Sequence, residues 1–331
     1  MAKRKKGQPV HGWVIIDKPQ GMTSTQVVGA VRRIFDARKA GHAGTLDPMA
    51  TGVLAVALGE ATKTVPYAMD SRKTYRFIAH WGEARDSDDA EGKITATHDK
   101  RPTRAEIESA LPGFTGAIVQ VPPAYSAIKV QGERAYDLAR EGEVVELAPR
   151  TVEVHEARLL GMPDADHAEF EIRCGKGTYV RAWVRDLAQA LGTVGHVSAL
   201  RRTSVGGFTE EMAIPLERLQ GEAHPESRPE NKLAREGGSV HIPAAFEHLR
   251  PIATALDGIP ALAVTGQEAL RLRSGNPILI RANQFAKITE GQSETDDLQG
   301  LTVFLQSSEG EPVALAEFAS GELRPFRVFN L

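Results

Sequence analysis

The 331-residue sequence has a single cysteine, Cys174, and few aromatic side chains, which make up 6% of it. One cysteine excludes an intramolecular disulfide and any zinc site built from a cysteine cluster, and this usage fits a reducing cytosol. No apolar run approaches the ~20 residues of a membrane-spanning helix, and the basic N-terminus (MAKRKKG) is not followed by an apolar segment of signal-peptide type. We therefore expect a cytoplasmic protein outside the membrane.

The sequence also has little excess of either charge, because its net charge is only −3. The positive and negative residues are nevertheless distributed unevenly along the chain. Residues 1–42 contain nine Lys or Arg against two Asp or Glu (+7), and residues 173–202 contain six against one (+5), so the rest carries −15. Such basic segments indicate a polyanionic partner, although charge runs are more often solvated faces. The length exceeds the ~250–300 residues of one hydrophobic core, so we expect two domains.

Residues 40–48 (AGHAGTLDP) contain two glycines and a proline, which disfavour a regular element and predict a shaped loop. The loop presents one imidazole, His42, and one carboxylate, Asp47. The apolar run that follows at residues 52–59 has the length and bounding glycines of a buried strand. A carboxylate mounted beside a core strand is typical of a nucleophile or general base. The alternative is an ordinary turn in which Asp47 caps a neighbouring backbone.

Residues 41–48 (GHAGTLDP) resemble the catalytic-aspartate motif of the TruB family, the tRNA pseudouridine-55 synthases. Three further motifs occur in the family's order, at residues 17–21 (DKPQG), 73–76 (KTYR) and 175–181 (GKGTYVR). Four motifs in order are a specific signal. The resemblance covers residues 10–210 well and the C-terminal third loosely.

The resemblance implies an α+β fold, in which a pseudouridine synthase catalytic domain has a mixed, mainly antiparallel sheet flanked by helices. A small C-terminal PUA-like β-barrel would follow it. We expect a basic tail at residues 1–10, the catalytic domain at 11–219, a linker-like region at 220–257 and the PUA-like RNA-binding domain at 258–331. The linker-like region combines prolines and glycines with many charges. Short strand-like runs after residue 258 are typical of a small barrel.

Hydrophobic periodicity predicts the elements that carry these motifs. We expect strands at residues 13–16, 73–81, 151–160, 168–174, 195–202, 277–281, 301–305 and 312–318, and helices at about 24–35, 60–69, 103–111 and 178–191.

Converting uridine into pseudouridine breaks the N1–C1′ bond, rotates the base and rejoins it through C5. The resemblance makes Asp47 the catalytic carboxylate, which would attack the base, attack the ribose or abstract a ribose proton. It implies that Arg181 pairs with Asp47 when the base displaces water, and that Tyr75 stacks on the target uracil. Without the resemblance, Arg181 would be a phosphate contact or a surface pair, and Tyr75 a core residue.

The resemblance also assigns four residues to substrate binding. His42 would insert into the T loop where flipped bases leave a gap, and Tyr179 and Leu200 would wall the uracil pocket. Lys18 would contact a phosphate or position a loop. Without the resemblance, Tyr179 and Leu200 would be core residues and Lys18 a solvated lysine.

We therefore expect a monomeric enzyme that flips and isomerises uridine 55 in the T loop of tRNA, with Asp47 as nucleophile. Neither a cofactor nor a metal is expected, because the reaction involves no redox change and no high-energy donor. The alternative is a non-catalytic tRNA-binding or RNA-chaperone protein, whose function would survive Asp47→Ala.

A third hypothesis is a metal-dependent phosphotransferase with a phosphate cradle at residues 175–178 and acidic ligands Asp86, Asp88 and Asp89. The cradle lacks the spacing of a P-loop, and the acidic run lacks the glycine of an EF-hand. We expect residues 86–92 to form a solvated loop at the border of the basic groove.

Overall fold

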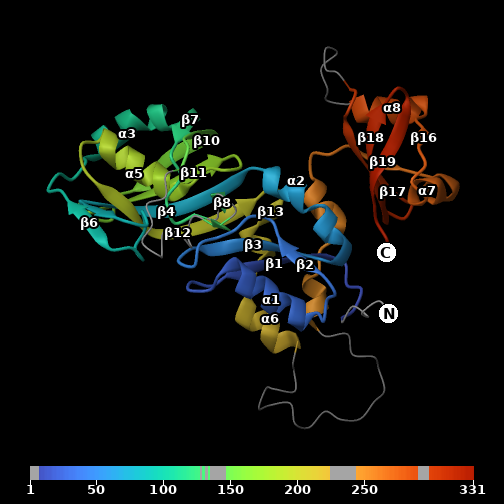
Figure 1. The fold of residues 1–331 in the computed structure, drawn as a ribbon, viewed down its shortest axis with the longest axis horizontal. Coiled ribbons are helices and arrows are strands. Elements are labelled where there is room, and N and C mark those ends of the chain that lie inside the picture. Colours follow the sequence, from blue (N-terminus) through green and yellow to red (C-terminus); the bar gives the residue numbers. More distant parts are fainter. Residues whose placement is uncertain (1–6, 127–128, 131–132, 135–146, 224–243, 290–297) are drawn as a thin grey trace, which may run out of the picture.

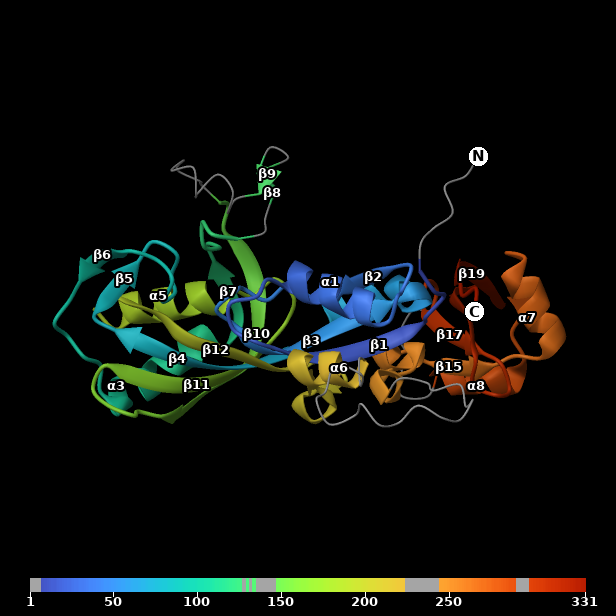
Figure 2. The same ribbon diagram turned by 90° about the horizontal axis from the view of Figure 1, so that it is seen from below.

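The computed structural model describes residues 7–126, 129–130, 133–134, 147–223, 244–289 and 298–331. Much of the expected basic tail and of the linker-like region lies outside these described residues. Figures 1 and 2 show an elongated molecule in which a long twisted sheet is followed, at one end, by a smaller C-terminal sheet. No helix in the described ranges is long and apolar enough to cross a membrane.

The larger sheet has ten strands in the order β14-β1-β3-β12-β4-β11-β10-β7, with β2 paired to β3 and β13 to β12. Two pairings are parallel, β1 with β14 and β3 with β12, and the others are antiparallel. This confirms the mixed, mainly antiparallel sheet. Its strands are β1 (Gly12–Lys18), β2 (Ala40–His42), β3 (Thr51–Leu58), β4 (Lys73–Trp81), β7 (Gly116–Gln120), β10 (Arg150–Gly161), β11 (His167–Cys174), β12 (Gly195–Val205), β13 (Phe208–Thr209) and β14 (Ile214–Pro215).

Helices flank this sheet, and short hairpins extend from it. The helices are α1 (Ser24–Ile34), α2 (Val65–Asp70), α3 (Arg104–Ala110), α5 (Val180–Ala190) and α6 (Leu216–Ala223), with 3₁₀ turns at Gly59–Lys63, Leu111–Phe114 and Glu210–Met212. The hairpins are β5 (Glu83–Arg85) with β6 (Ile94–Thr97), and β8 (Lys129–Val130) with β9 (Glu133–Arg134).

Two of these helices follow directly from the sequence pattern. Thr23 caps α1, because its side chain accepts from the backbone N–H of Gln26 and the Gln26 side chain accepts from the N–H of Thr23. In α5 the expected apolar stripe is buried, and Trp183 packs edge-on against Phe77 of β4 and Phe170 of β11. The buried residues of α5 recur with the helical period of 3.6 residues, and they pack against alternate residues of the strands. This contact fixes α5 on one face of the sheet.

The helical stretch expected at residues 60–69 is present, but it is divided into two elements. A 3₁₀ turn at Gly59–Lys63 precedes a separate helix, α2, which has Pro66 in its first turn. Proline lacks a backbone N–H and clashes with the carbonyl four residues before it, so a helix that starts earlier cannot continue through Pro66.

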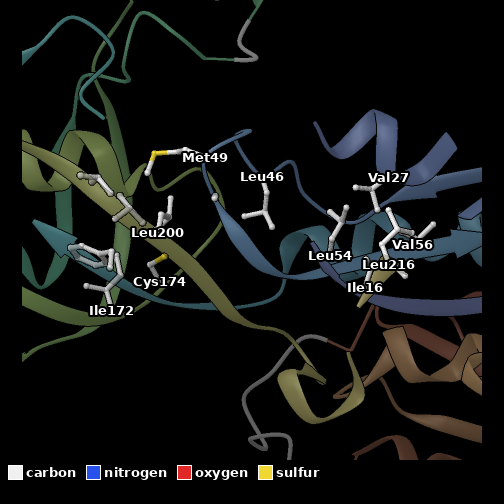
Figure 3. Close-up of a cluster of buried hydrophobic side chains, with 14 of the residues drawn as sticks. Ile16, Val27, Leu46, Met49, Leu54, Val56, Ile172, Cys174, Leu200 and Leu216 are labelled. Carbon is white, nitrogen blue, oxygen red and sulfur yellow. The ribbon is translucent and has the colours of Figure 1, made fainter. Parts of the chain in front are cut away.

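One hydrophobic cluster extends along most of the larger sheet (Figure 3). In the figure it includes Ile16 and Leu216 at one end, and Ile172 and Cys174 at the other, with Leu46 between the two ends. The residue before the candidate nucleophile is therefore fixed in the core, and Leu46 is only 4% exposed.

The C-terminal region forms a five-stranded mixed sheet in the order β15-β17-β18-β19-β16. Its elements are β15 (Ala261–Ala263), α7 (Gly266–Arg273), β16 (Ile278–Leu279), α8 (Ala282–Thr289), β17 (Thr302–Gln306), β18 (Pro312–Ala319) and β19 (Glu322–Val328). Phe304, Leu315 and Phe329 share a buried cluster with Trp13 of β1. The two sheets are thus joined through a common apolar contact.

The described end of the linker-like region also belongs to this contact. Two 3₁₀ turns, Ala244–His248 and Ile252–Leu256, follow the undescribed stretch. Trp13 and Arg250 each donate a backbone N–H to the other's carbonyl, at 2.8 and 2.7 Å. Ile252 and Leu256 are buried against the same cluster as Trp13. Residues 244–257 therefore pack on the larger sheet.

Candidate active site

The loop that carries Asp47 is fixed by hydrogen bonds from the start of α1. The Ser24 hydroxyl accepts from the backbone N–H of Leu46 at 2.9 Å and donates to the Leu46 carbonyl at 3.1 Å. The backbone N–H of Gly21 donates to the carbonyl of Pro48 at 2.8 Å. Both neighbours of Asp47 are thus held, which orients its carboxylate before any substrate binds.

Lys18 contributes to the same arrangement. Its side chain is fully buried, and Nζ donates to the carbonyls of Pro19, Met22 and Pro48 at 2.9, 2.6 and 3.1 Å. Burial lowers the pKa of the Lys18 ammonium to about 8, and the negative charge of Asp47 opposes this shift. Of the two roles expected for Lys18, loop positioning matches these contacts.

Arg202 also supports the loop, and it was not among the site residues expected from the sequence. Its side chain is 1% exposed, and it donates to the carbonyls of Val53, Thr45 and Gly44 at 2.8, 3.4 and 3.0 Å. Gly52 lies against its backbone with φ +95°, and a Cβ at residue 52 would overlap the Arg202 carbonyl oxygen. The parallel pairing of Arg202 with Gly52 creates this close approach.

Arg181 faces Asp47 from the start of α5. Its Nε lies 3.0 Å from Oδ2 of Asp47, and its side chain is 3% exposed, against 33% for Asp47. Its other nitrogens donate to the carbonyls of Ser87 and Tyr125, both at 2.8 Å. A buried guanidinium with these fixed acceptors presents one edge to the carboxylate.

The acidic loop at residues 86–92 is part of this site, so the expectation of a solvated loop is wrong. Asp89 is 3% exposed, and its Oδ2 lies 3.4 Å from Nη1 of Arg181. Asp88 pairs with Arg185 at 2.8 Å, and its carbonyl accepts from the N–H of Val197 on β12. The physical reason is that α5 directs two buried or half-buried arginines at this loop, and their charges need partners.

These charges set the protonation of Asp47. Burial raises the pKa of the Asp47 carboxyl above its ordinary value, and the nearby Asp89 carboxylate also raises it. The Arg181 guanidinium opposes the rise through its charge and its contact, and the Lys18 ammonium does so more weakly. Arg181 thus favours the ionised form of a desolvated carboxylate.

A cavity of about 810 Å³ opens over this pair. Three of the expected site residues, His42, Asp47 and Arg181, line it. The other lining residues come from the start of α1, the Asp47 loop, the acidic loop with Lys93, and the segment after β7, and they are Thr23, Ser24, Thr25, Thr45, Leu46, Pro48, Asp86, Ser87, Asp89, Glu91, Gly92, Lys93, Tyr125 and Ser126. The volume suffices for a nucleotide, because ligand pockets commonly enclose ~300–1,000 Å³.

His42 is half-buried in the cavity wall. Burial lowers the pKa of its imidazole, and the charge of Arg202 lowers it further, so His42 is neutral at pH 7. Its Nδ1 is buried without a hydrogen-bond partner among the described residues. The side chain as a whole lines the cavity, so the imidazole can contact a ligand there.

Tyr75, Tyr179 and Leu200 do not line the cavity. Tyr75 of β4 is half-buried, and burial raises the pKa of its phenol, while a hydrogen bond with Arg202 lowers it. The negative charge of Asp47 also raises the Tyr75 pKa, so the two side chains are electrostatic neighbours.

Tyr179 precedes α5, and its carbonyl and N–H exchange hydrogen bonds with the Gln120 side chain at 3.3 and 3.1 Å. The Arg150 guanidinium lies 5.4 Å from the centre of the Tyr179 ring. Leu200 is 7% exposed and pairs with Phe77 in the β12–β4 ladder. Tyr179 is thus held at the start of α5, and Leu200 is held on β12, the strand that carries Arg202.

The phosphotransferase hypothesis finds no support in the loop at residues 175–178. The N–H of Gly175 donates to the Glu153 carbonyl at 2.8 Å, and the Lys176 ammonium pairs with Asp70 at 2.6 Å. The acidic residues proposed as metal ligands are instead bonded to arginines and to backbone N–H groups. The N–H of Gly175 and the ammonium of Lys176 are thus already used within the protein.

The fold defines a class. Over its whole length the chain is similar in structure to an H/ACA RNP bound to a substrate RNA containing 2′-deoxyuridine, with a TM-score of 0.68, 21% identity and 92% of that chain covered. It is equally similar to an archaeal box H/ACA sRNP Nop10-Cbf5 complex, with a TM-score of 0.68, 22% identity and 93% of that chain covered. The chain therefore has the pseudouridine synthase fold.

Sequence comparison gives the family. The model of the TruB family pseudouridylate synthase N-terminal domain matches residues 32–180, and that of the tRNA pseudouridylate synthase B C-terminal domain matches residues 181–257. The chain is 53% identical to tRNA pseudouridine synthase B of Bradyrhizobium diazoefficiens, covering all of this chain and 91% of that protein. It is 51% identical to the protein of the same name in a Caulobacter species, covering both chains completely. The chain belongs to the TruB family.

Proposed function

We propose that the protein isomerises uridine 55 in the T loop of tRNA to pseudouridine, with Asp47 as the nucleophile. One observation carries this proposal. The carboxylate of Asp47 lies on a rigid loop in a nucleotide-sized cavity, 3.0 Å from a buried arginine. Membership of the TruB family and relatives named tRNA pseudouridine synthase B support the reaction and the substrate class.

In this proposal the ionised carboxylate of Asp47 forms a transient covalent bond with the target nucleotide as the N1–C1′ bond breaks. The detached uracil rotates, C5 bonds to C1′, the bond to Asp47 breaks and restores its carboxylate, the C5 proton leaves and N1 gains a proton, so the product is an isomer of the substrate. Arg181 favours the ionised form of Asp47 while the base excludes water. No cofactor or metal takes part.

Tyr75 and Arg181 act beside Asp47. Tyr75 stacks on the uracil, which is worth ~1–3 kcal/mol for a base on an aromatic ring. Its closeness to Asp47 supports this role, because the charge of Asp47 raises the pKa of the Tyr75 phenol. Rotation of the side chain toward the cavity would place the ring on the base.

The structure supports the proposed binding roles of His42, Tyr179, Leu200 and Lys18 to different extents. The His42 side chain lines the cavity, which supports its insertion into the T loop. Tyr179 and Leu200 would form the far wall of the uracil pocket. Lys18 acts through the loop, because its ammonium is bonded to three carbonyls.

The basic segments would dock the phosphates of the T stem-loop, and the five-stranded C-terminal sheet would act as a PUA-like RNA-binding module. We retain the division into a basic tail (1–10), a catalytic domain (11–219), a linker-like region (220–257) and this module (258–331). We also propose that the protein acts as a monomer. A cytoplasmic location would bring the enzyme to its tRNA.

The experiment uses an in vitro transcribed tRNA and the same tRNA with cytidine at position 55. Pseudouridine is mapped by chemical labelling and primer extension after incubation in EDTA. We expect one modified position, 55, in the first RNA and none in the second. Modification at another position would contradict the substrate assignment. Tight tRNA binding without modification would favour the non-catalytic RNA-binding alternative.

A further inference from the structure

A cluster of three potential metal ligands lies at the end of β4 remote from Tyr75. His80, Glu83 and His196 have ligand atoms that all lie within 4.8 Å of one another. His80 and His196 are directly opposite in the antiparallel β4–β12 ladder, so their side chains project from the same face. The ring centres are 4.9 Å apart. Sheet register, rather than a loop, thus holds the two imidazoles together.

We propose that His80, Glu83 and His196 bind one first-row divalent transition-metal ion, with zinc as the representative. Two imidazoles and one carboxylate form a three-ligand set that suits zinc, with water as the fourth ligand. Magnesium and calcium prefer oxygen ligands and do not match it.

His196 has the arrangement of a metal-ligating histidine. Its side chain is 1% exposed, and its Nδ1 lies 2.9 Å from the carbonyl oxygen of Glu83. A carbonyl only accepts, so Nδ1 carries the proton and Nε2 keeps its lone pair for an ion. Protein ligands of zinc are commonly oriented in this way by a backbone carbonyl.

His80 is oriented from its other side by a third histidine. The ring of His167 stacks on His80 at 4.6 Å with an interplanar angle of 16°, and Nδ1 of His167 is bonded to Asp164 at 2.8 Å. His167 therefore fixes the plane of the His80 ring. We treat it as a positioning residue and not as a ligand.

Glu83 has one oxygen for the ion and one for a neighbouring arginine. Its Oε2 lies 3.1 Å from Nη2 of Arg85, which leaves the second oxygen for coordination. Zinc bonds of ~2.0–2.2 Å place tetrahedral ligand atoms about 3.3–3.5 Å apart, so an ion would draw the three side chains inward. His80 and Glu83 are half-exposed and can make this adjustment.

The proposed ion is structural and separate from the isomerisation. His80 and Tyr75 lie on the same strand, and five residues at ~3.3 Å per residue separate them by about 16 Å. The ion would tie β4, β5 and β12 together at one end of the larger sheet. This site departs from the metal-free protein expected from the sequence, although the chemistry at Asp47 needs no metal.

The test uses full-length protein without a histidine tag, freed of metal by chelator and dialysis. Zinc chloride is titrated by calorimetry into wild type, His80→Ala, Glu83→Gln and the control His155→Ala, whose histidine lies on β10 outside the cluster. Melting temperatures without metal establish that each variant is folded. His196 is not substituted, because it is buried.

We expect one zinc ion per chain in wild type and in His155→Ala, and affinity at least about tenfold lower in His80→Ala and Glu83→Gln. Zinc should raise the Tm of wild type and of the control, because it binds the folded state, and leave the Tm of both cluster variants unchanged. No zinc binding by wild type, or equal affinity in His80→Ala, would overturn the proposal.

Discussion

Nε of Arg181 lies 3.0 Å from Oδ2 of Asp47, and the arginine is almost fully buried while the aspartate is one-third exposed to the cavity. The guanidinium is held by two backbone carbonyls and by Asp89, so its position does not depend on Asp47. The pair is thus asymmetric, with a fixed cation and a carboxylate that faces the substrate. This asymmetry leads to our first prediction.

Arg181→Lys should lower the single-turnover rate of uridine isomerisation by about 10²–10³, in the range seen when one stabilising donor is removed from an active site. A lysine keeps the charge but cannot contact Asp47, Ser87 and Tyr125 together. The matched control is Arg76→Lys, whose exposed arginine pairs with Glu171 at 2.9 Å. A wild-type rate in Arg181→Lys would contradict this role.

Gly52→Ala should destabilise the fold by about 2–3 kcal/mol in urea denaturation. Residue 52 has φ +95°, and a Cβ there would overlap the carbonyl oxygen of Arg202. The control is Gly113→Ala, because a Cβ at Gly113 meets nothing within 4 Å. Equal stability of the two variants would show that the contact between β3 and β12 is not tight.

The rate should fall on the acid side at a pH above the ordinary aspartate pKa of ~3.9. The reason is that burial raises the pKa of Asp47, so protonation removes the nucleophile at a higher pH than in a solvated carboxyl. In Arg181→Gln the acid limb should move to still higher pH, because the opposing guanidinium is gone. Single-turnover rates across pH check both points, and an acid limb that stays in place in Arg181→Gln would contradict the electrostatic role.

Affinity for tRNA should fall with salt, at a log–log slope of about −0.7 to −0.9 for each phosphate contact. The physical basis is the basic balance of residues 1–42, in which the basic segments 32–33 and 38–39 are exposed, in a chain whose net charge is −3. Filter binding across a salt series gives the slope. A salt-insensitive Kd would exclude docking through these segments.

The resemblance to the TruB family locates the Asp47 loop and its partner on α5, whereas the sequence pattern alone predicts only a shaped loop that presents a carboxylate. The sequence pattern also predicts the main strands and helices, because β3 is a continuous apolar run and α5 has a clear apolar stripe. These features are local, so spacing within one segment reveals them.

Contacts between distant segments could not be predicted in this way. Arg202 reaches the Asp47 loop only because β12 pairs in parallel with β3. In the sequence, Asp88 and Asp89 have the pattern of a solvated charge run. In the structure, α5 places Arg185 and Arg181 against them. Likewise, no motif joins His80 to His196, and only the antiparallel register does.

The measurement that tests the central claim most directly is the release of tritium from C5 of uridine in a T-arm stem-loop RNA. Wild type, Asp47→Asn and Asp47→Ala are compared in EDTA at saturating enzyme, with RNA binding measured in parallel. We expect release by wild type alone, from the T-loop uridine, with RNA still bound by both variants. Release by Asp47→Ala at the wild-type rate would contradict Asp47 as the nucleophile, and binding without release by wild type would contradict the isomerase itself.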